Sequence, residues 1–504
     1  MNADEAASDA KELRFAWLLV AAFVLLTIPR LFFHELWRDE AWLWLVVRES
    51  RGLSDLFTAL GRSGQGYLFP LLCVLAGQVS PSPRALQVLH LFLAASAAFV
   101  FARYAPLPRR ERVLFLLGYF PFYEYAVISR HYVAGALLTW LACTVARSGR
   151  RTILLAGLLA LLCQTTVYGF ILAMAIACGW HYDRWLRRRE LPALSLTEMM
   201  ASVALVAGGG IAGLVQLVPA SGTSFAPGWF VDRSLEHAGA TLAMVWRAFV
   251  PLPHLAIAFW NSNVLDPWPG LEAAAGLLTL GLAVSLLWRR KVALVTFLAG
   301  AAGVLLFGYA KYIGVMRHQG HLWLLFMAAV WLGTNPRSQP RHSWRERAVL
   351  AILGAHCLAG LYASWIDLRH PFSNGPATAE LIRSEGLDRF PLLGHREPPA
   401  AAVALPLGRP LYSPSRRMFT THPDWGPEQR EMSDGELRCA ARALARTERR
   451  DVVLVINREL PPWEELVPAG FRVGGIAPTE DFHLYRMPYG ALDASAGAAG
   501  CGDR

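Results

Sequence analysis

Long runs of apolar residues dominate the chain, and short segments rich in Arg, Pro and Gly separate them. A transmembrane helix needs roughly 20 mostly apolar residues. Runs suited to this role lie at 15–33, 84–103, 113–128, 132–148, 152–166, 167–183, 198–219, 270–288, 292–310, 321–334 and 347–365. The pattern predicts an all-α polytopic membrane protein with about 11 transmembrane helices.

Two further apolar stretches, 67–80 and 240–260, are shorter or interrupted by Pro and Arg. They are typical of interfacial helices that lie along the membrane or re-enter it. After residue 366 the chain becomes polar, with helix-like stretches at Ala377–Ser384 and Asp434–Thr447 and a short strand at Val452–Ile456. We therefore expect an N-terminal segment at 1–14, a transmembrane domain at 15–366, a small α/β domain at 367–490 and a disordered Ala/Gly/Ser-rich tail at 491–504.

The composition agrees with this division, since 54% of the 504 residues are hydrophobic and 17% are charged. A soluble domain averages about 25% charged residues, and a single core stops growing near about 250–300 residues. The composition therefore indicates a membrane protein, and it excludes a disordered or collagen-like protein. The cysteines show no CxxC or Cys/His spacing of the kind that binds zinc.

Positive charge gives the orientation. With the N-terminus in the cytoplasm, the Arg-rich segments 103–112, 147–151, 184–189 and 289–291 all fall on the inner side, as the positive-inside rule requires. This holds only if 67–80 does not cross the membrane. We expect a multi-pass protein of the cytoplasmic (inner) membrane, with a cytoplasmic N-terminus and an extracytoplasmic C-terminal domain. The net charge of +10 is then a topology signal and implies no nucleic-acid partner.

The first outer loop, 34–83, carries two adjacent carboxylates, Asp39 and Glu40, flanked by Trp37, Trp42 and Trp44. Ionisable groups near membrane depth are costly, so they tend to be functional or paired. Tryptophan suits the headgroup layer. The alternative interpretation is a capped interfacial helix, with Asp39 as its N-cap and Glu40 favouring the helix dipole.

A second outer cluster, 119–132, places Glu124, Arg130 and His131 among aromatic residues. It can also be interpreted as an aromatic belt with a Glu/Arg pair. Gln65 and Tyr67, at the start of the stretch 67–80, are weaker candidates for contacts with hydroxyl groups. Structural roles remain the alternative for both.

A third cluster, 311–321, contains Lys311, Arg317 and His318. Cations on the outer side run against the positive-inside rule, so they indicate an anionic partner there, although snorkelling to lipid phosphates is the alternative. Together the three loops offer a carboxylate that can deprotonate a hydroxyl group and cations that can hold a phosphate leaving group.

These features resemble a GT-C glycosyltransferase, in the branch of the protein O-mannosyltransferases and the lipid A aminoarabinose transferase. The resemblance rests on four segments and covers about residues 10–330 by architecture. The segments are Asp39–Glu40 after the first span, Gly66-Tyr-Leu-Phe-Pro70 leading to Arg84, the basic turn Arg109–Arg112 followed by Ser129-Arg-His-Tyr132, and the C-terminal outer domain.

The resemblance implies inverting transfer of a sugar from a polyprenyl-phosphate carrier to a hydroxyl acceptor on a glycan, lipid or protein, at the outer face of the membrane. Asp39 would be the base, and Glu40 would orient it or bind acceptor. The donor phosphate would contact Arg130, His131, Arg317, His318 and Lys311. Sugar or acceptor would contact Glu124, Tyr67, Gln65 and Trp42.

The sequence departs from this family in one place, because relatives often have a Pro-Pro pair where this chain has Gln65-Gly-Tyr-Leu-Phe-Pro70. The first loop contains no DxD motif, so we expect no metal and no other cofactor. Two other functions stay open. A transporter or flippase for a lipid-linked anion would need intramembrane charges or broken helices, and a non-catalytic membrane scaffold would use the outer domain to bind partners.

Overall fold

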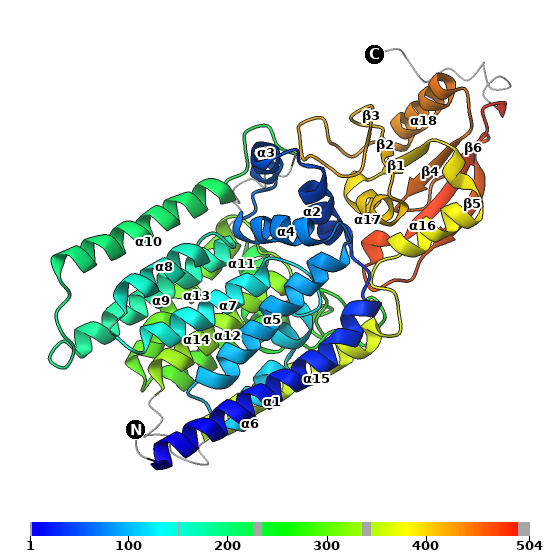
Figure 1. Cartoon of the computed structure of the whole chain (residues 1–504). Coiled ribbons are helices and arrows are strands. Elements are labelled where there is room, and N and C mark those ends of the chain that lie inside the picture. Colours follow the sequence, from blue (N-terminus) through cyan, green and yellow to red (C-terminus); the bar gives the residue numbers. More distant parts are fainter. Residues whose placement is uncertain (1–2, 150, 225–233, 335–343, 492–504) are drawn as a thin grey trace.

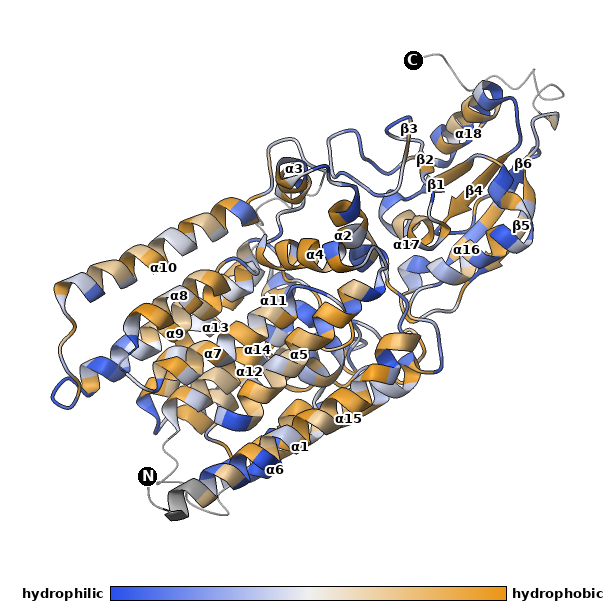
Figure 2. Ribbon diagram, in the orientation of Figure 1, coloured by the Kyte–Doolittle hydropathy of each residue, from blue (hydrophilic) through white to orange (hydrophobic). Residues whose placement is uncertain are grey.

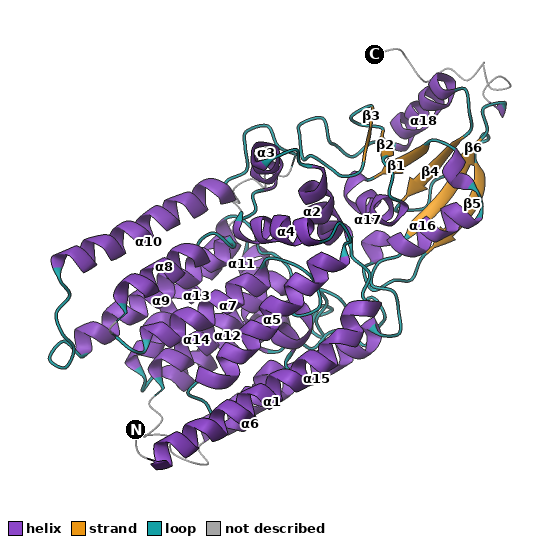
Figure 3. Cartoon of the chain, in the orientation of Figure 1, coloured by secondary structure: helices purple, strands orange, loops and turns teal. Residues whose placement is uncertain are grey.

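The computed structural model describes residues 3–149, 151–224, 234–334 and 344–491, and it is mostly helical (Figure 1 and Figure 3). Within these residues six helices are long and apolar enough to cross a membrane, as judged by length and composition. They are α1 (Ala3–Phe33), α5 (Arg84–Tyr104), α10 (Leu196–Leu217), α12 (Pro269–Leu287), α13 (Lys291–Ala310) and α15 (Trp344–Asp367). Further helices complete the bundle, namely α6 (Arg109–Leu116), α7 (Tyr132–Ala146), α8 (Thr152–Leu162), α9 (Val167–Leu186), α11 (Leu235–Phe249) and α14 (Met316–Gly333).

The predicted fold class is confirmed, since helix is found at each predicted span and a small sheet domain follows. Six of the 11 predicted spans coincide with the helices that are long and apolar enough to cross a membrane, and those at 132–148 and 152–166 coincide with shorter apolar helices. The predicted span 113–128 needs correction because it is not one continuous helix. Helix α6 ends at Leu116, and a π-helical turn, η1 (Tyr119–Glu124), follows. Pro121 has no N–H group to donate to a helix. At Gly118 an added Cβ atom would lie 3.0 Å from both Phe115 O and His356 Cβ, so the chain bends tightly against α15.

Three helices at one end of the bundle carry the predicted outer loop. They are α2 (Arg38–Glu49), α3 (Leu53–Ser63) and α4 (Leu68–Val79), and they lie next to the C-terminal domain, whereas the N-terminus lies at the opposite end (Figure 1). Helix α4 has 12 residues, fewer than a span needs. Hydrophobic residues line the bundle helices, and hydrophilic residues are more frequent in the C-terminal domain (Figure 2). The predicted tail lies outside the described residues beyond Ala491.

The C-terminal domain is built on a six-stranded sheet with the order β3-β2-β1-β4-β6-β5. Its strands are β1 (Leu392–His395), β2 (Leu411–Ser413), β3 (Met418–Thr420), β4 (Val452–Ile456), β5 (Val467–Arg472) and β6 (Phe482–Met487). The strand β1 pairs in parallel with β2 and β4, and the other pairings are antiparallel. The predicted strand at Val452–Ile456 is therefore central in the sheet.

Helices cover the sheet and explain why β4 is apolar at every position. Val453 and Val455 belong to one apolar cluster with α16 (Gly375–Ser384) and α17 (Glu397–Leu407), and Val452 and Leu454 belong to another with α18 (Asp434–Glu448). Successive side chains of a strand point to opposite faces, so a strand covered on both faces reads as a continuous apolar run. The bundle core also includes Phe372 and Ile476, so it continues into the C-terminal domain.

Candidate active site

Asp39 lies in the first turn of α2, directly after the end of α1. The residue that precedes the helix, Trp37, has extended backbone and is the N-cap. The interpretation of Asp39 as the N-cap is therefore wrong. Glu40 closes the capping box instead, because its Oε2 accepts the Trp37 N–H at 3.2 Å. This leaves the Asp39 side chain available for contacts outside its own helix.

Guanidinium groups from three segments surround the Asp39 carboxylate. Its Oδ2 lies 3.5 Å from Arg130 Nη2 and 3.9 Å from Arg317 Nη2, and its Oδ1 lies 3.6 Å from Arg38 Nε. The Asp39 side chain is 22% exposed, so it borders on solvent. Burial alone would raise the pKa of this carboxyl, but Arg130, Arg38 and Arg317 outweigh burial and hold the pKa below its ordinary value. Asp39 is therefore ionised at neutral pH.

Glu40 is fully buried and anchors the start of α2. Its Oε2 lies 3.2 Å from His34 Nε2, and its Oε1 accepts the Ser129 N–H. His34 Nδ1 in turn lies 3.2 Å from Asp367 Oδ2 at the end of α15. Burial would lower the pKa of His34, but Asp367 and Glu40 outweigh burial and raise the pKa well above its ordinary value. His34 thus donates a proton to a carboxylate on each side, and both oxygens of Glu40 are engaged within the protein.

Arg130 and Arg317 keep hydrogen-bond donors that no described residue satisfies. Arg130 Nη1 donates to the Asp39 backbone oxygen at 3.0 Å, and the Arg317 guanidinium lies 5.1 Å and 5.2 Å from the rings of Trp37 and Trp260. Within the described residues, the buried Nε atoms of both arginines and Nε1 of Trp37 have no hydrogen-bond partner. Buried donors normally have partners, so the cluster is suited to an oxygen-rich anion.

The remaining basic candidates have different surroundings. His318 Nδ1 accepts the Val315 N–H at 3.1 Å. Its Nε2 therefore carries the proton of a neutral ring, and it donates to the Tyr132 hydroxyl at 2.9 Å. His318 thus caps α14 with both nitrogens engaged. His131 is buried with its ring 4.3 Å from that of Tyr132. Lys311 is the C-cap of α13.

Glu124 lies in the interior and is joined to the site through Trp260. It accepts hydrogen bonds from the Tyr119 hydroxyl at 3.0 Å and from Trp260 Nε1 at 3.1 Å. The same Trp260 ring packs against Arg317. Glu124 is 1% exposed, so it supports the aromatic wall of the site and does not border on solvent.

Three further residues, Trp42, Tyr67 and Gln65, were predicted to contact sugar or acceptor. Trp42 is buried, and its Nε1 donates to the Pro423 backbone oxygen at 2.9 Å, so its ring packs at the contact with the C-terminal domain. The Tyr67 ring stacks on Phe57 at 5.0 Å, and its N–H donates to Gln216 Oε1. Gln65 Oε1 is buried with no hydrogen-bond partner among the described residues.

Several residues around Asp39 were not predicted as site residues from the sequence. They are Arg38, His34, Trp260, Asp367 and Glu480. Arg38 was within reach of sequence reasoning because it adjoins Asp39. His34 also lies in the first loop, four residues before α2. Trp260, Asp367 and Glu480 come from distant segments, and only the tertiary fold brings them to α2. The described residues contain no group of three or more His, Cys, Asp or Glu that could hold a metal ion, and metal independence stays a prediction.

No family model matches the chain, and no curated protein matches it. A solved structure that resembles it is ArnT from Cupriavidus metallidurans, crystallised with undecaprenyl phosphate bound. The two are 12% identical, the match covers 97% of this chain and 99% of that chain, and the TM-score is 0.48. We therefore argue the chemistry of the site from its own contacts alone.

Proposed function

We propose that the protein is a membrane glycosyltransferase. It moves a sugar from a polyprenyl-phosphate carrier to a hydroxyl acceptor at the end of the bundle that carries α2 and the C-terminal domain. The observation that carries this proposal is the contact of Asp39 with Arg130 and Arg317, at 3.5 Å and 3.9 Å. A partly exposed base thus lies beside cations with unused donors.

Each group has a distinct role in this reaction. Asp39 accepts the proton of the acceptor hydroxyl, whose oxygen then bonds to the anomeric carbon of the sugar. The bond between that carbon and the phosphate oxygen breaks, and the polyprenyl phosphate leaves with the electron pair. Arg130 and Arg317 stabilise its negative charge. Attack opposite the leaving group inverts the anomeric configuration.

The ion pairs also link donor binding to the strength of the base. In the free protein the arginines lower the pKa of Asp39, which makes it a weak base. A bound phosphate neutralises part of their charge, so the pKa of Asp39 rises when the donor is present. The unpartnered Nε atoms of Arg130 and Arg317 let the phosphate bind without displacing Asp39 from the Nη2 atoms.

The test is transfer by purified protein in lipid nanodiscs. Labelled polyprenyl-phosphate hexoses and pentoses serve as donors, and extracted cell-envelope glycans, lipids and proteins serve as acceptors. We expect release of polyprenyl phosphate coupled to labelling of an acceptor. Asp39→Asn should lower the rate by about 100-fold or more, in the range of a lost general base. The matched control is Asp388→Asn, an exposed carboxylate of the C-terminal domain.

Full transfer by Asp39→Asn would overturn the mechanism. Movement of labelled donor across sealed liposomes with no bond broken would replace the proposal by a flippase. Absence of both activities, together with retained binding of a partner protein by the C-terminal domain, would support the scaffold.

A further inference from the structure

The C-terminal domain contacts α2, the helix that carries Asp39, along its whole length. At the start of the helix, Glu480 Oε1 accepts the Arg38 N–H at 2.6 Å. In the middle, Trp42 Nε1 donates to the Pro423 backbone oxygen at 2.9 Å. At the end, Glu49 Oε2 accepts the Thr421 hydroxyl at 2.6 Å. The domain therefore constrains both ends of the helix.

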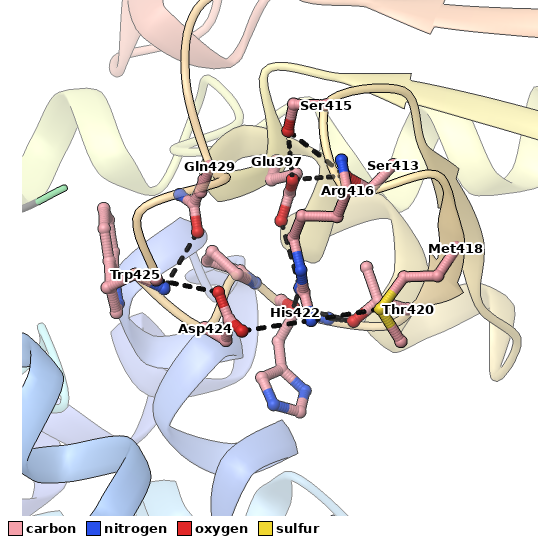
Figure 4. Close-up of polar contacts among 12 residues, drawn as sticks. Glu397, Ser413, Ser415, Arg416, Met418, Thr420, His422, Asp424, Trp425 and Gln429 are labelled. Carbon is pink, nitrogen blue, oxygen red and sulfur yellow. Dashed lines mark hydrogen bonds and ion pairs between the residues drawn. The ribbon is translucent and has the colours of Figure 1, made fainter. Parts of the chain in front are cut away.

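The loop after β3 that reaches α2 is held in place by a chain of ion pairs. Arg416 Nη1 lies 3.3 Å from Glu397 Oε2, and Arg416 Nη2 lies 3.3 Å from Asp424 Oδ2 (Figure 4). Asp424 Oδ2 also lies 3.2 Å from Arg62 Nη1 of α3. This chain of ion pairs links the loop around β3 to α3, the helix that follows α2.

Glu480 is the contact nearest to Asp39. It ends the short helix η4 (Pro478–Glu480) and is fully buried. Its Oε2 accepts the Ser373 hydroxyl, and its Oε1 accepts the N–H of the first residue of α2. That N–H has no acceptor within its own helix, and a negative charge at a helix N-terminus is favourable.

We propose that Glu480 is a positioning residue for Asp39. Glu480 fixes the first turn of α2 from the C-terminal domain without touching either substrate. The activity readout rests on the proposed function, whereas the contact with α2 does not. The domain thereby controls where the Asp39 carboxylate lies relative to Arg130 and Arg317. A shift of that turn would weaken the placement of the base.

The charges around Glu480 make this contact sensitive to pH. Burial raises the pKa of Glu480 to about 7, and the Asp39 carboxylate adds to this effect, while hydrogen bonds from Ser373 and Arg38 and the charge of Arg38 oppose it. Two further titratable residues lie in the segment before α2. Glu35 accepts the Phe372 N–H at 2.8 Å, and His34 pairs with Asp367 and Glu40. Above pH 7 the ionised Glu480 makes charge-assisted hydrogen bonds, which are roughly twice as strong as neutral ones.

The experiment compares wild type, Glu480→Gln and the control Glu436→Gln between pH 5.5 and 8.5. Glutamine can still accept the Arg38 N–H, but it cannot ionise. Glu436 lies on α18, caps that helix, and has a pKa of about 2, so it stays ionised throughout. For wild type and the control we expect kcat to rise through pH 7. For Glu480→Gln we expect a flat profile there and about 3- to 10-fold lower kcat at pH 8. The loss of charge assistance in the contacts of residue 480 is worth about as much as one neutral hydrogen bond.

Two further readouts separate positioning from general stability. Because an ionised carboxyl with a raised pKa destabilises the fold above its unfolded pKa, Glu480→Gln should have a Tm at pH 8 equal to or above that of wild type. The amide hydrogens in the first turn of α2 should nevertheless exchange faster in Glu480→Gln than in wild type at pH 8. Faster exchange in the absence of any transfer by wild type would support the contact and reject the proposed function. Unchanged exchange and an unchanged pH profile, with Asp39→Asn inactive, would overturn this inference alone.

Discussion

Asp39 Oδ2 lies 3.5 Å from Nη2 of Arg130, although the two residues are 91 positions apart in the chain. The contact joins the first turn of α2 to the segment between η1 and α7. It brings an ionised carboxylate and a buried guanidinium to one place. The contact lowers the pKa of Asp39, and in the proposed reaction it also sets the affinity for the donor.

The first prediction concerns the pH dependence of the base. The arginines hold the pKa of Asp39 below its ordinary value, so in wild type the acid limb of kcat/KM lies below that of a free aspartate. Removal of one cation by Arg317→Gln should move this limb to higher pH, because less positive charge stabilises the carboxylate. The measurement is the pH profile of kcat/KM from pH 3.5 to 7. A limb that stays in place would show that Asp39 is not the titrating base.

The second prediction concerns donor affinity. Arg130→Gln removes a buried cation next to Asp39, so the KM for the polyprenyl-phosphate donor should rise by about 10-fold or more, from the loss of one charged hydrogen bond worth about 1.5–3 kcal/mol. Added inorganic phosphate or polyprenyl phosphate should inhibit the variant less than wild type. Arg446→Gln, at an exposed position of α18, is the control. A rise in the acceptor KM alone would assign Arg130 to the acceptor.

The third prediction concerns the buried network of His34, Glu40 and Asp367. Glu40→Gln removes one carboxylate from a buried pair, so the free energy of unfolding should fall by on the order of 3 kcal/mol. The pKa of His34 is raised well above 6.5 in the folded protein. Its contribution to stability is therefore complete below the unfolded pKa and is lost as the pH rises through the folded value.

Thermal unfolding between pH 5 and 10 tests this prediction. Wild type should lose stability toward alkaline pH, and Glu40→Gln should show a weaker dependence. An identical slope in both proteins would mean that Glu40 does not set the protonation of His34.

The fourth prediction separates packing from sugar binding at Trp42. Trp42→Phe keeps most of the buried ring but removes the hydrogen bond to Pro423, so it should cost about 1 kcal/mol of stability. The KM values for donor and acceptor should change by less than about twofold, because the ring is buried. A large change in the acceptor KM with unchanged stability would restore Trp42 as a sugar contact.

The apolar runs and the Arg-rich segments between them were enough to predict a helical membrane protein, the short helix α4 and the strand β4. These features follow from local composition, because a membrane and a doubly covered strand both demand continuous apolar runs. The bend at Gly118 was not predicted, since it depends on how closely α6 and η1 approach His356 of α15. Local sequence does not encode that approach.

The sequence by itself determined which residue types stand on the outer loops, and so it named Asp39, Arg130 and Arg317 as candidates. The tertiary structure alone decided which candidates meet. It placed Trp42 against the C-terminal domain, engaged both nitrogens of His318 within the protein, and brought Trp260 and Glu480 to α2. The physical reason is that periodicity reports burial along one element, whereas a site depends on distances between elements that packing sets.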